Sequence, residues 1–117
     1  MLQKKYIESR QLCEVTFALP KAELPEDIEA ESVHLVGEFN YWNQTATPMK
    51  LGKGQRTFRT TLELAPAQRY QFRYLVNGEY WCNDQQADSY VANDWGQANS
   101  VVATPPAATP LEASQES

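Results

Sequence analysis

The chain has 117 residues and a formal net charge of −5, so it can bury the core of one domain, and its charge argues against a nucleic-acid partner. No apolar run approaches the ~18 residues of a membrane span, so no membrane partner is expected. The charged start lacks the apolar segment of a secretory signal, which predicts a cytoplasmic protein whose two cysteines, Cys13 and Cys82, are free thiols.

The polar and charged start of the chain forms an N-terminal extension, residues 1–11. Leu2, Tyr6 and Ile7 recur at roughly helical spacing, which is compatible with a short terminal helix. Residues 13–19 then alternate between apolar and mostly polar side chains, and a proline follows them. This pattern predicts the first half-buried strand.

A solvated, carboxylate-rich connection over residues 21–31 leads to a second strand, expected over residues 32–38. This strand runs into an aromatic, asparagine-rich loop, in which we expect Phe39 to be part of the core. The indole of Trp42 lies in a polar context and suits either of two roles. It can stack on a flat ligand, or it can fold back as a lid over the end of the sandwich.

The second half of the chain holds further short strands separated by turn signals. The strongest pattern is over residues 69–76, where aromatic and apolar side chains alternate with polar ones. Asn77-Gly78 is the preferred two-residue hairpin turn, so residues 79–82 are expected to pair back. The remaining strands are expected over residues 48–51, 57–64 and 100–102.

Short strands, frequent turns and no convincing long helix predict an all-β fold, an antiparallel β-sandwich of about seven strands. We expect this domain to span residues 12–103. Residues 104–117 are rich in proline, alanine, serine and glutamate, and such a segment cannot bury enough apolar surface to order itself. It is therefore expected to be a disordered tail.

Four motifs follow one another along this domain: the aromatic loop at 35–42, the strand and hairpin at 70–78, Trp81 with Asp84, and the closing strand at 96–102. In this order they resemble the isoamylase N-terminal, or early-set (E-set), domains. These are carbohydrate-binding module family 48, which includes the glycogen-binding domain of the AMP-activated protein kinase β subunit. The resemblance implies an immunoglobulin-like sandwich and, in many members, binding of an α-1,4-linked glucan such as glycogen or starch. Since no catalytic barrel follows, we expect a standalone module.

The resemblance also implies a carbohydrate-binding site, whose candidate residues are Trp42, Arg73, Tyr80, Trp81, Trp95 and Asn99. Trp42 and Trp81 match the two tryptophans on which family members stack glucose. Tyr80 is an extra residue in that hairpin and leaves open which of the two aromatics, Tyr80 or Trp81, faces the sugar, because a one-residue slip reverses the face of a strand.

The other candidates match polar or apolar contacts of the family. Arg73 replaces a lysine, and an arginine fork is not equivalent to a lysine point charge. Asn99 matches a sugar-bonding asparagine, and Trp95 stands where some members place an apolar residue against the glucan coil. Each candidate also has a structural alternative: Trp81 can cap the core, Arg73 can be a solvated strand residue, Asn99 can bond its own backbone, and Trp95 can plug the sandwich end.

Catalysis is not expected. His34 is the single histidine and lies mid-strand without a nucleophile pattern. Asp84, Asp88 and Asp94 form a loose acidic group that could in principle hydrolyse glycosides or hold calcium, but they lack EF-hand spacing and are predicted to be solvated turn carboxylates. We therefore expect no metal and no other cofactor.

Two functions of different classes follow from these residues. The first is a non-catalytic module that binds an α-glucan such as glycogen and can tether a glycan-active enzyme to it. The alternative is an accessory protein–protein interaction sandwich that packs on a carbohydrate-active enzyme without binding sugar itself.

Overall fold

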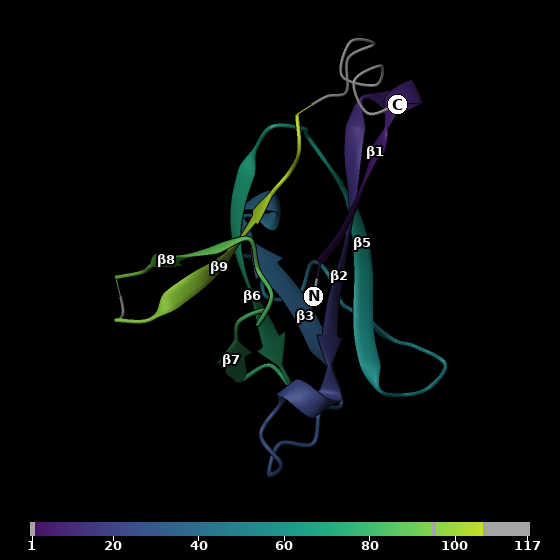
Figure 1. The fold of residues 1–117 in the computed structure, drawn as a ribbon. Coiled ribbons are helices and arrows are strands. Elements are labelled where there is room, and N and C mark those ends of the chain that lie inside the picture. The colour runs from purple at the N-terminus through teal and green to yellow at the C-terminus, as the bar shows by residue number, and fades with distance from the viewer. Residues whose placement is uncertain (1, 95, 107–117) are drawn as a thin grey trace.

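The computed structural model describes residues 2–94 and 96–106, which form two antiparallel sheets packed face to face (Figure 1). Besides strands, this part of the chain has only short 3-10 turns, so the predicted all-β, immunoglobulin-like sandwich is confirmed. It has nine strands rather than about seven, because residues 2–7 and 89–92 are also strands.

The first sheet has the order β1-β2-β5-β4, with bounds β1 (Leu2–Ile7), β2 (Leu12–Pro20), β4 (Lys50–Leu51) and β5 (Thr57–Leu64). The second sheet has the order β3-β6-β9-β8, with bounds β3 (Val33–Gly37), β6 (Arg69–Val76), β8 (Ser89–Ala92) and β9 (Ala98–Ala103). The short strand β7 (Tyr80–Cys82) also pairs with β6. In the first sheet β2 forms a long pairing with β5. In the second sheet the long strand β6 pairs with β3, β7 and β9.

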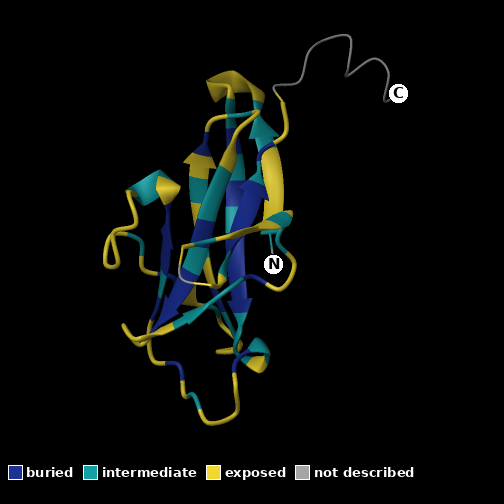
Figure 2. Ribbon diagram, turned by 90° about the vertical axis from the view of Figure 1, so that its left-hand side faces the viewer, coloured by how far each residue is buried: buried dark blue, intermediate teal, exposed yellow. Residues whose placement is uncertain are grey.

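Strands of both sheets contain many buried residues, coloured dark blue in Figure 2, and the apolar ones among them form the core cluster. Three aromatic rings form the centre of this core: Phe17 packs edge-on against Phe72 at 5.1 Å between ring centroids, and Phe72 packs likewise against Tyr74 at 5.6 Å. Phe39 lies 5.5 Å from Phe17 and joins the same cluster. The expectation that Phe39 belongs to the core is confirmed.

The N-terminal segment is a strand, so the expectation of a short helix there is wrong. All of β1 pairs with β2, with Leu2 opposite Phe17 and Ile7 opposite Leu12. Gln11, at φ 52°, turns the chain between the two strands. A helix of so few residues is marginal on its own, whereas pairing with β2 gives every residue of β1 a partner in the sheet.

The Asn77-Gly78 turn forms with both residues in the left-handed region, at φ 55° and 73°, but its register differs from the prediction. Val76 lies opposite Tyr80, so the loop has three residues and includes Glu79. A two-residue loop would have set the indole of Trp81 opposite the fully buried Tyr74. The observed register puts the smaller Cys82 there instead.

Asp84 is fully buried, so the prediction of solvated turn carboxylates is wrong for this residue. The Tyr74 hydroxyl donates to Asp84 Oδ2 at 2.7 Å, and the Gln86 amide donates to Asp84 Oδ1 at 2.7 Å. Burial, followed by the nearby Asp84 carboxylate, raises the pKa of Tyr74. Asp84 thus anchors the turn after β7 to the core.

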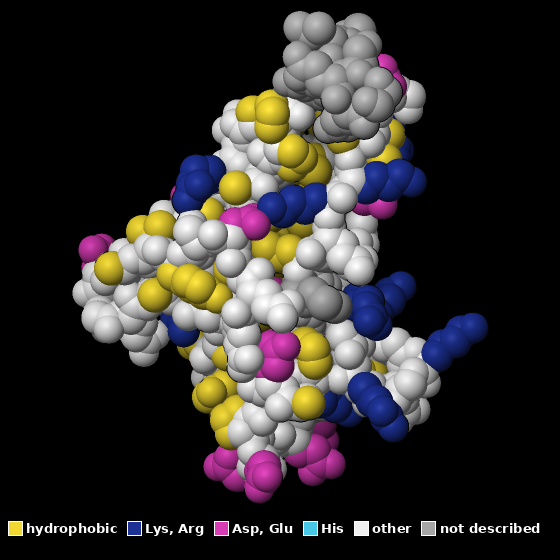
Figure 3. Space-filling view, viewed as in Figure 1, with side chains coloured by type: hydrophobic (Ala, Val, Ile, Leu, Met, Phe, Trp, Pro, Cys, Tyr) yellow, Lys and Arg dark blue, Asp and Glu magenta, His cyan; other side chains and the backbone are white. Residues whose placement is uncertain are grey.

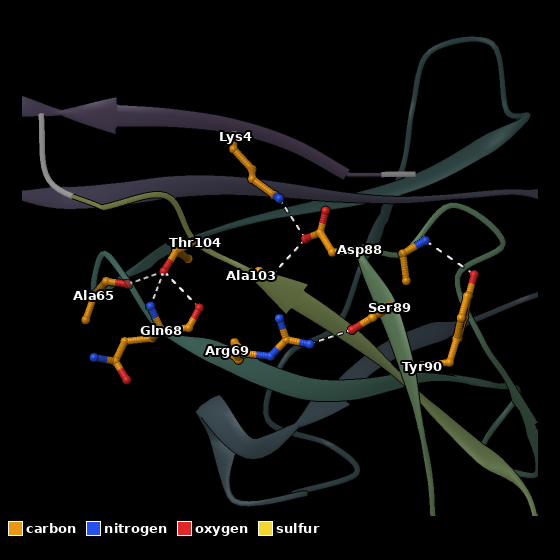
Figure 4. A network of polar contacts seen from close by, with 10 residues as sticks. Lys4, Ala65, Gln68, Arg69, Asp88, Ser89, Tyr90, Ala103 and Thr104 are labelled. Atoms are coloured by element: carbon orange, nitrogen blue, oxygen red, sulfur yellow. Dashed lines mark hydrogen bonds and ion pairs between the residues drawn. The ribbon is translucent and has the colours of Figure 1, made fainter. Parts of the chain in front are cut away.

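Asp88 ties the two sheets together at their edges. Lys4 Nζ of β1 lies 2.6 Å from Asp88 Oδ2, which also accepts the Ala103 amide at 2.7 Å (Figure 4). Asp94, by contrast, is exposed. Within the described residues, no three His, Cys, Asp or Glu side chains gather into a possible metal site.

The chain beyond β9 begins with a bonded residue. Thr104 is buried, and its hydroxyl donates to the Ala65 carbonyl and accepts the Gln68 amide (Figure 4). The rest of the expected tail, residues 107–117, lies outside the described residues. None of the described segments forms a helix of the length and hydropathy needed to cross a membrane.

Candidate functional site

The aromatic loop after β3 is held by a glycine and an asparagine. A Cβ on Gly37 would lie 2.6 Å from the Gln71 carbonyl oxygen, so only glycine fits against β6 at this point. The Gly37 amide donates to Asn40 Oδ1 at 3.0 Å, and Asn40 Nδ2 donates to the Leu35 carbonyl at 2.8 Å. The Asn40 side chain therefore bonds to backbone groups at the end of β3 and holds the loop in this conformation.

The same loop presents Trp42 at the surface. Tyr41 and Trp42 both adopt left-handed backbone angles, at φ 58° and 59°, and the Trp42 amide donates to the Gly37 carbonyl at 2.8 Å. This conformation costs a residue other than glycine about 1–2 kcal/mol, and such strain is concentrated at functional sites. Trp42 keeps 39% of its surface exposed. Part of its indole is therefore open to solvent.

The three-residue hairpin loop determines where Trp81 lies. Trp81 is opposite Leu75, and strand alternation places Leu75 on the same face of β6 as Arg73, away from the core. The Arg73 guanidinium carbon lies 6.0 Å from the centroid of the Trp81 ring, within cation–π range. Arg73 and Trp81 thus share the outer face of the second sheet.

Amide side chains form a hydrogen-bonded network beside these two residues. Asn99 is only 9% exposed; its Nδ2 donates to Gln71 Oε1, and its Oδ1 accepts from Asn93 Nδ2, both at 3.1 Å. Asn93 Oδ1 accepts the Gln97 amide at 3.1 Å, and Arg73 Nη1 donates to Gln97 Oε1 at 2.7 Å. The polar groups are therefore positioned before any ligand arrives.

These side chains surround one pocket of about 490 Å³, lined by Trp42, Arg73, Trp81, Asn93, Gln97 and Asn99. A pocket of this size suits a small molecule or a few sugar rings. The structure thus brings together Trp42, Arg73, Trp81 and Asn99 of the predicted site. Tyr80 instead lines a separate depression beside Asp27 and Glu79. Trp95 lies outside the described residues.

Sequence reasoning missed Gln71, Asn93 and Gln97. The Asn93 amide donates to the Gln97 carbonyl at 2.9 Å, which closes the hairpin between β8 and β9. The sequence feature that could have indicated this turn was Gly96, which lies between the amide residues Asn93 and Gln97. In the structure Gly96 adopts φ 75°. This turn was missed because β8 has only four residues, is mostly exposed and was not predicted as a strand.

The residues that line the pocket suit binding better than catalysis. The described residues of its lining provide two indoles, three amides and one guanidinium, and no carboxylate, thiol or imidazole is among them. Burial is the main cause that raises the pKa of the nearby Cys82 to about 11, so this thiol stays neutral and a poor nucleophile at neutral pH. His34 lies in β3 and bridges to Pro48, which is not among the pocket residues.

An immunoglobulin-like sandwich with an indole-and-amide pocket on one sheet is the architecture of a carbohydrate-binding module. Residues 26–109 match the family described as the glycogen recognition site of AMP-activated protein kinase. This match covers well over half of the chain, and the chain belongs to this family of glycogen-binding domains. All the pocket residues lie within the matched segment. A comparison with curated proteins gives no match.

Proposed function

We propose that this chain is a non-catalytic module that binds an α-1,4-glucan of the glycogen or starch type. Glucose rings would stack on Trp42 and Trp81, and their hydroxyls would bond to the polar side chains between the two indoles. The observation that supports the proposal is that Trp42 and Trp81 line the same pocket as Arg73 and Asn99.

The chemistry of glucose fits these groups. Each ring has apolar C–H faces and a rim of hydroxyls, so stacking on an indole buries apolar surface while the rim stays free to bond. Arg73 gives one N–H to Gln97, and its buried Nε has no partner among the described residues. A guanidinium has five N–H groups, so donors remain for sugar hydroxyls.

The proposed location is the cytoplasm, with a glycan-active enzyme as the tethered partner. Cys13 and Cys82 are both free thiols, the state in which cysteines persist in a reducing compartment. Glycogen is uncharged, so the net charge of −5 does not oppose binding.

Native electrophoresis of the full chain, with glycogen or amylopectin in the gel, tests the proposal. Glucan should retard the wild type, and Trp42→Ala and Trp81→Ala should each lose at least about tenfold in affinity, a loss typical of a buried aromatic anchor. The matched control is Tyr41→Ala, because Tyr41 neighbours Trp42 in the loop, shares its backbone conformation, is 92% exposed and does not line the pocket.

Thermal melts would confirm that each variant is folded. If neither glucan retards the wild type, the chain is not a glucan-binding module, and the accessory-sandwich alternative takes its place. Retardation that persists in both tryptophan variants would put the sugar elsewhere on the surface.

A further inference from the structure

One segment of this acidic chain carries only positive charge. Residues 39–62 contain Lys50, Lys53, Arg56 and Arg59 and no acidic residue, so all 15 Asp and Glu side chains lie elsewhere. The four cations belong to β4, β5 and the turn between them, and we refer to them as the basic hairpin. The chain therefore contains a strongly basic region although its net charge is −5.

The fold brings these charges together on one side of the molecule. Lys50 lies directly opposite Arg59 in the β4–β5 pairing, and both side chains are exposed. The Arg59 guanidinium also extends over Gly52, where a Cβ would lie 3.2 Å from Nη1. In Figure 3 the dark blue side chains gather on the side of β5 and the β4–β5 turn, while magenta groups gather at the lower end.

None of the four cations has an ion-pair partner within the described residues, where the recorded pairs are Lys4 with Asp88 and Arg10 with Glu63. Like charges directly opposite each other in a sheet are destabilising. Lysine side chains in particular protect edge strands from aggregation, but the edge strand β4 contains Lys50 alone of the four cations, so this role leaves the other three without an explanation. The positive sign of this cluster therefore calls for an anionic partner.

We propose that the basic hairpin docks an acidic segment of a partner protein. Its four cations would pair with clustered Asp or Glu side chains of that segment. Since β4 has only two residues, the recognition runs through side chains and not through addition of a strand to the sheet.

A protein partner fits this surface better than a nucleic acid does. Single-stranded nucleic acids are held by cations together with exposed aromatic rings on which bases stack. The aromatic residue of the hairpin, Phe58, is 3% exposed and belongs to the core. The net charge of −5 would further repel a long polyanion, whereas a short acidic segment meets only the local cluster.

The docking surface and the pocket lie on opposite sides of the sandwich. By strand alternation Lys50 and Arg59 share a face with Ala18 and point outward from the first sheet, whereas the pocket lies on the outer face of the second. A partner can therefore bind while the pocket is free or filled. This proposal stands on the charges alone and does not depend on what the pocket binds.

Fluorescence anisotropy with the full chain tests the docking site. The probe is a short labelled peptide rich in Asp and Glu, and its control has Asn and Gln in their place. We expect binding of the acidic peptide that weakens at least about tenfold when salt rises from ~0.05 M to ~0.3 M. Lys50→Glu/Arg59→Glu should weaken it by at least about tenfold at low salt.

The matched control is Lys5→Glu/Arg69→Glu, which gives the same net charge with reversals on β1 and β6. It should bind the peptide nearly as well as the wild type. Lys53→Glu/Arg56→Glu changes only the turn. It takes the place of the strand variant in the test if the strand variant fails to fold. Equal loss in the control, absence of peptide binding, or tighter binding of a single-stranded oligonucleotide would each overturn the proposal.

Discussion

The pocket and the basic hairpin differ in whether their polar side chains have bonding partners. In the pocket, Arg73, Gln97, Asn93 and Asn99 are joined by hydrogen bonds that orient their side chains. In the hairpin, Lys50 and Arg59 face each other with no counter-charge in the described part of the chain. A pre-bonded amide network suits a neutral, hydroxyl-rich ligand, whereas unpaired cations suit an anionic one.

The largest expected effect comes from adding one methyl group to a glycine, which should matter in one region and not in the other. Gly37→Ala would push a Cβ to 2.6 Å from the Gln71 carbonyl, beneath the aromatic loop, and should lower the free energy of unfolding by about 3 kcal/mol. Gly54→Ala, in the basic hairpin, has no atom within 4 Å of the new Cβ and should change it by less than about 0.5 kcal/mol. Urea denaturation measures both, and equal effects would contradict the close packing beneath the loop.

The alkaline stability of the strand that carries Trp81 should depend on Cys82. Burial, the largest cause, raises the pKa of this thiol from 9.0 to about 11, so the folded state favours the neutral form. That stabilisation is complete below pH 9.0 and is lost as the pH rises to about 11, a change of about 2 kcal/mol in the free energy of unfolding. Unfolding curves for the wild type and Cys82→Ala between these pH values measure it. Parallel curves would show that the thiol is not the group responsible.

A smaller effect is expected from the amide network. Gln97→Ala removes the acceptor of Arg73 Nη1 at the mouth of the pocket and should weaken glycogen binding about fivefold, or about 1 kcal/mol. Lys53→Ala, a truncation in the basic hairpin, should leave glycogen binding unchanged. Affinity electrophoresis over a series of glycogen concentrations gives both constants, and the comparison fails if the two variants behave alike.

The smallest expected effect is the one that best sharpens the comparison. Lys50→Glu/Arg59→Glu should leave glycogen retention within about twofold of the wild type at every salt concentration, because a neutral glucan gains little from distant charge. Acidic-peptide binding should be lost in the same variant. Salt-dependent glycogen retention would show instead that the two surfaces are coupled.

Much of the fold and part of the site follow from local pattern. The spacing of Phe72, Tyr74 and Val76 places them on one face of β6, and all three are fully buried. Asn77 adopts the left-handed conformation that its pairing with Gly78 predicts. Because these signals are local, Phe39 and the strand that carries Arg73 were predicted from the sequence alone.

The tertiary structure decided what depends on neighbours distant in sequence. The sequence left open whether Tyr80 or Trp81 shares a face with Arg73, because one residue in the hairpin loop reverses the face of β7. The burial of Asp84 depends on a tyrosine ten residues away along the chain, and the amide network depends on β8, which is too exposed to predict. The sequence by itself determined seven of the nine strands and the aromatic loop, since side-chain alternation and turn residues act locally. Register, carboxylate burial and the meeting of two tryptophans in one pocket required the packed sheets, because these properties arise only when strands pair.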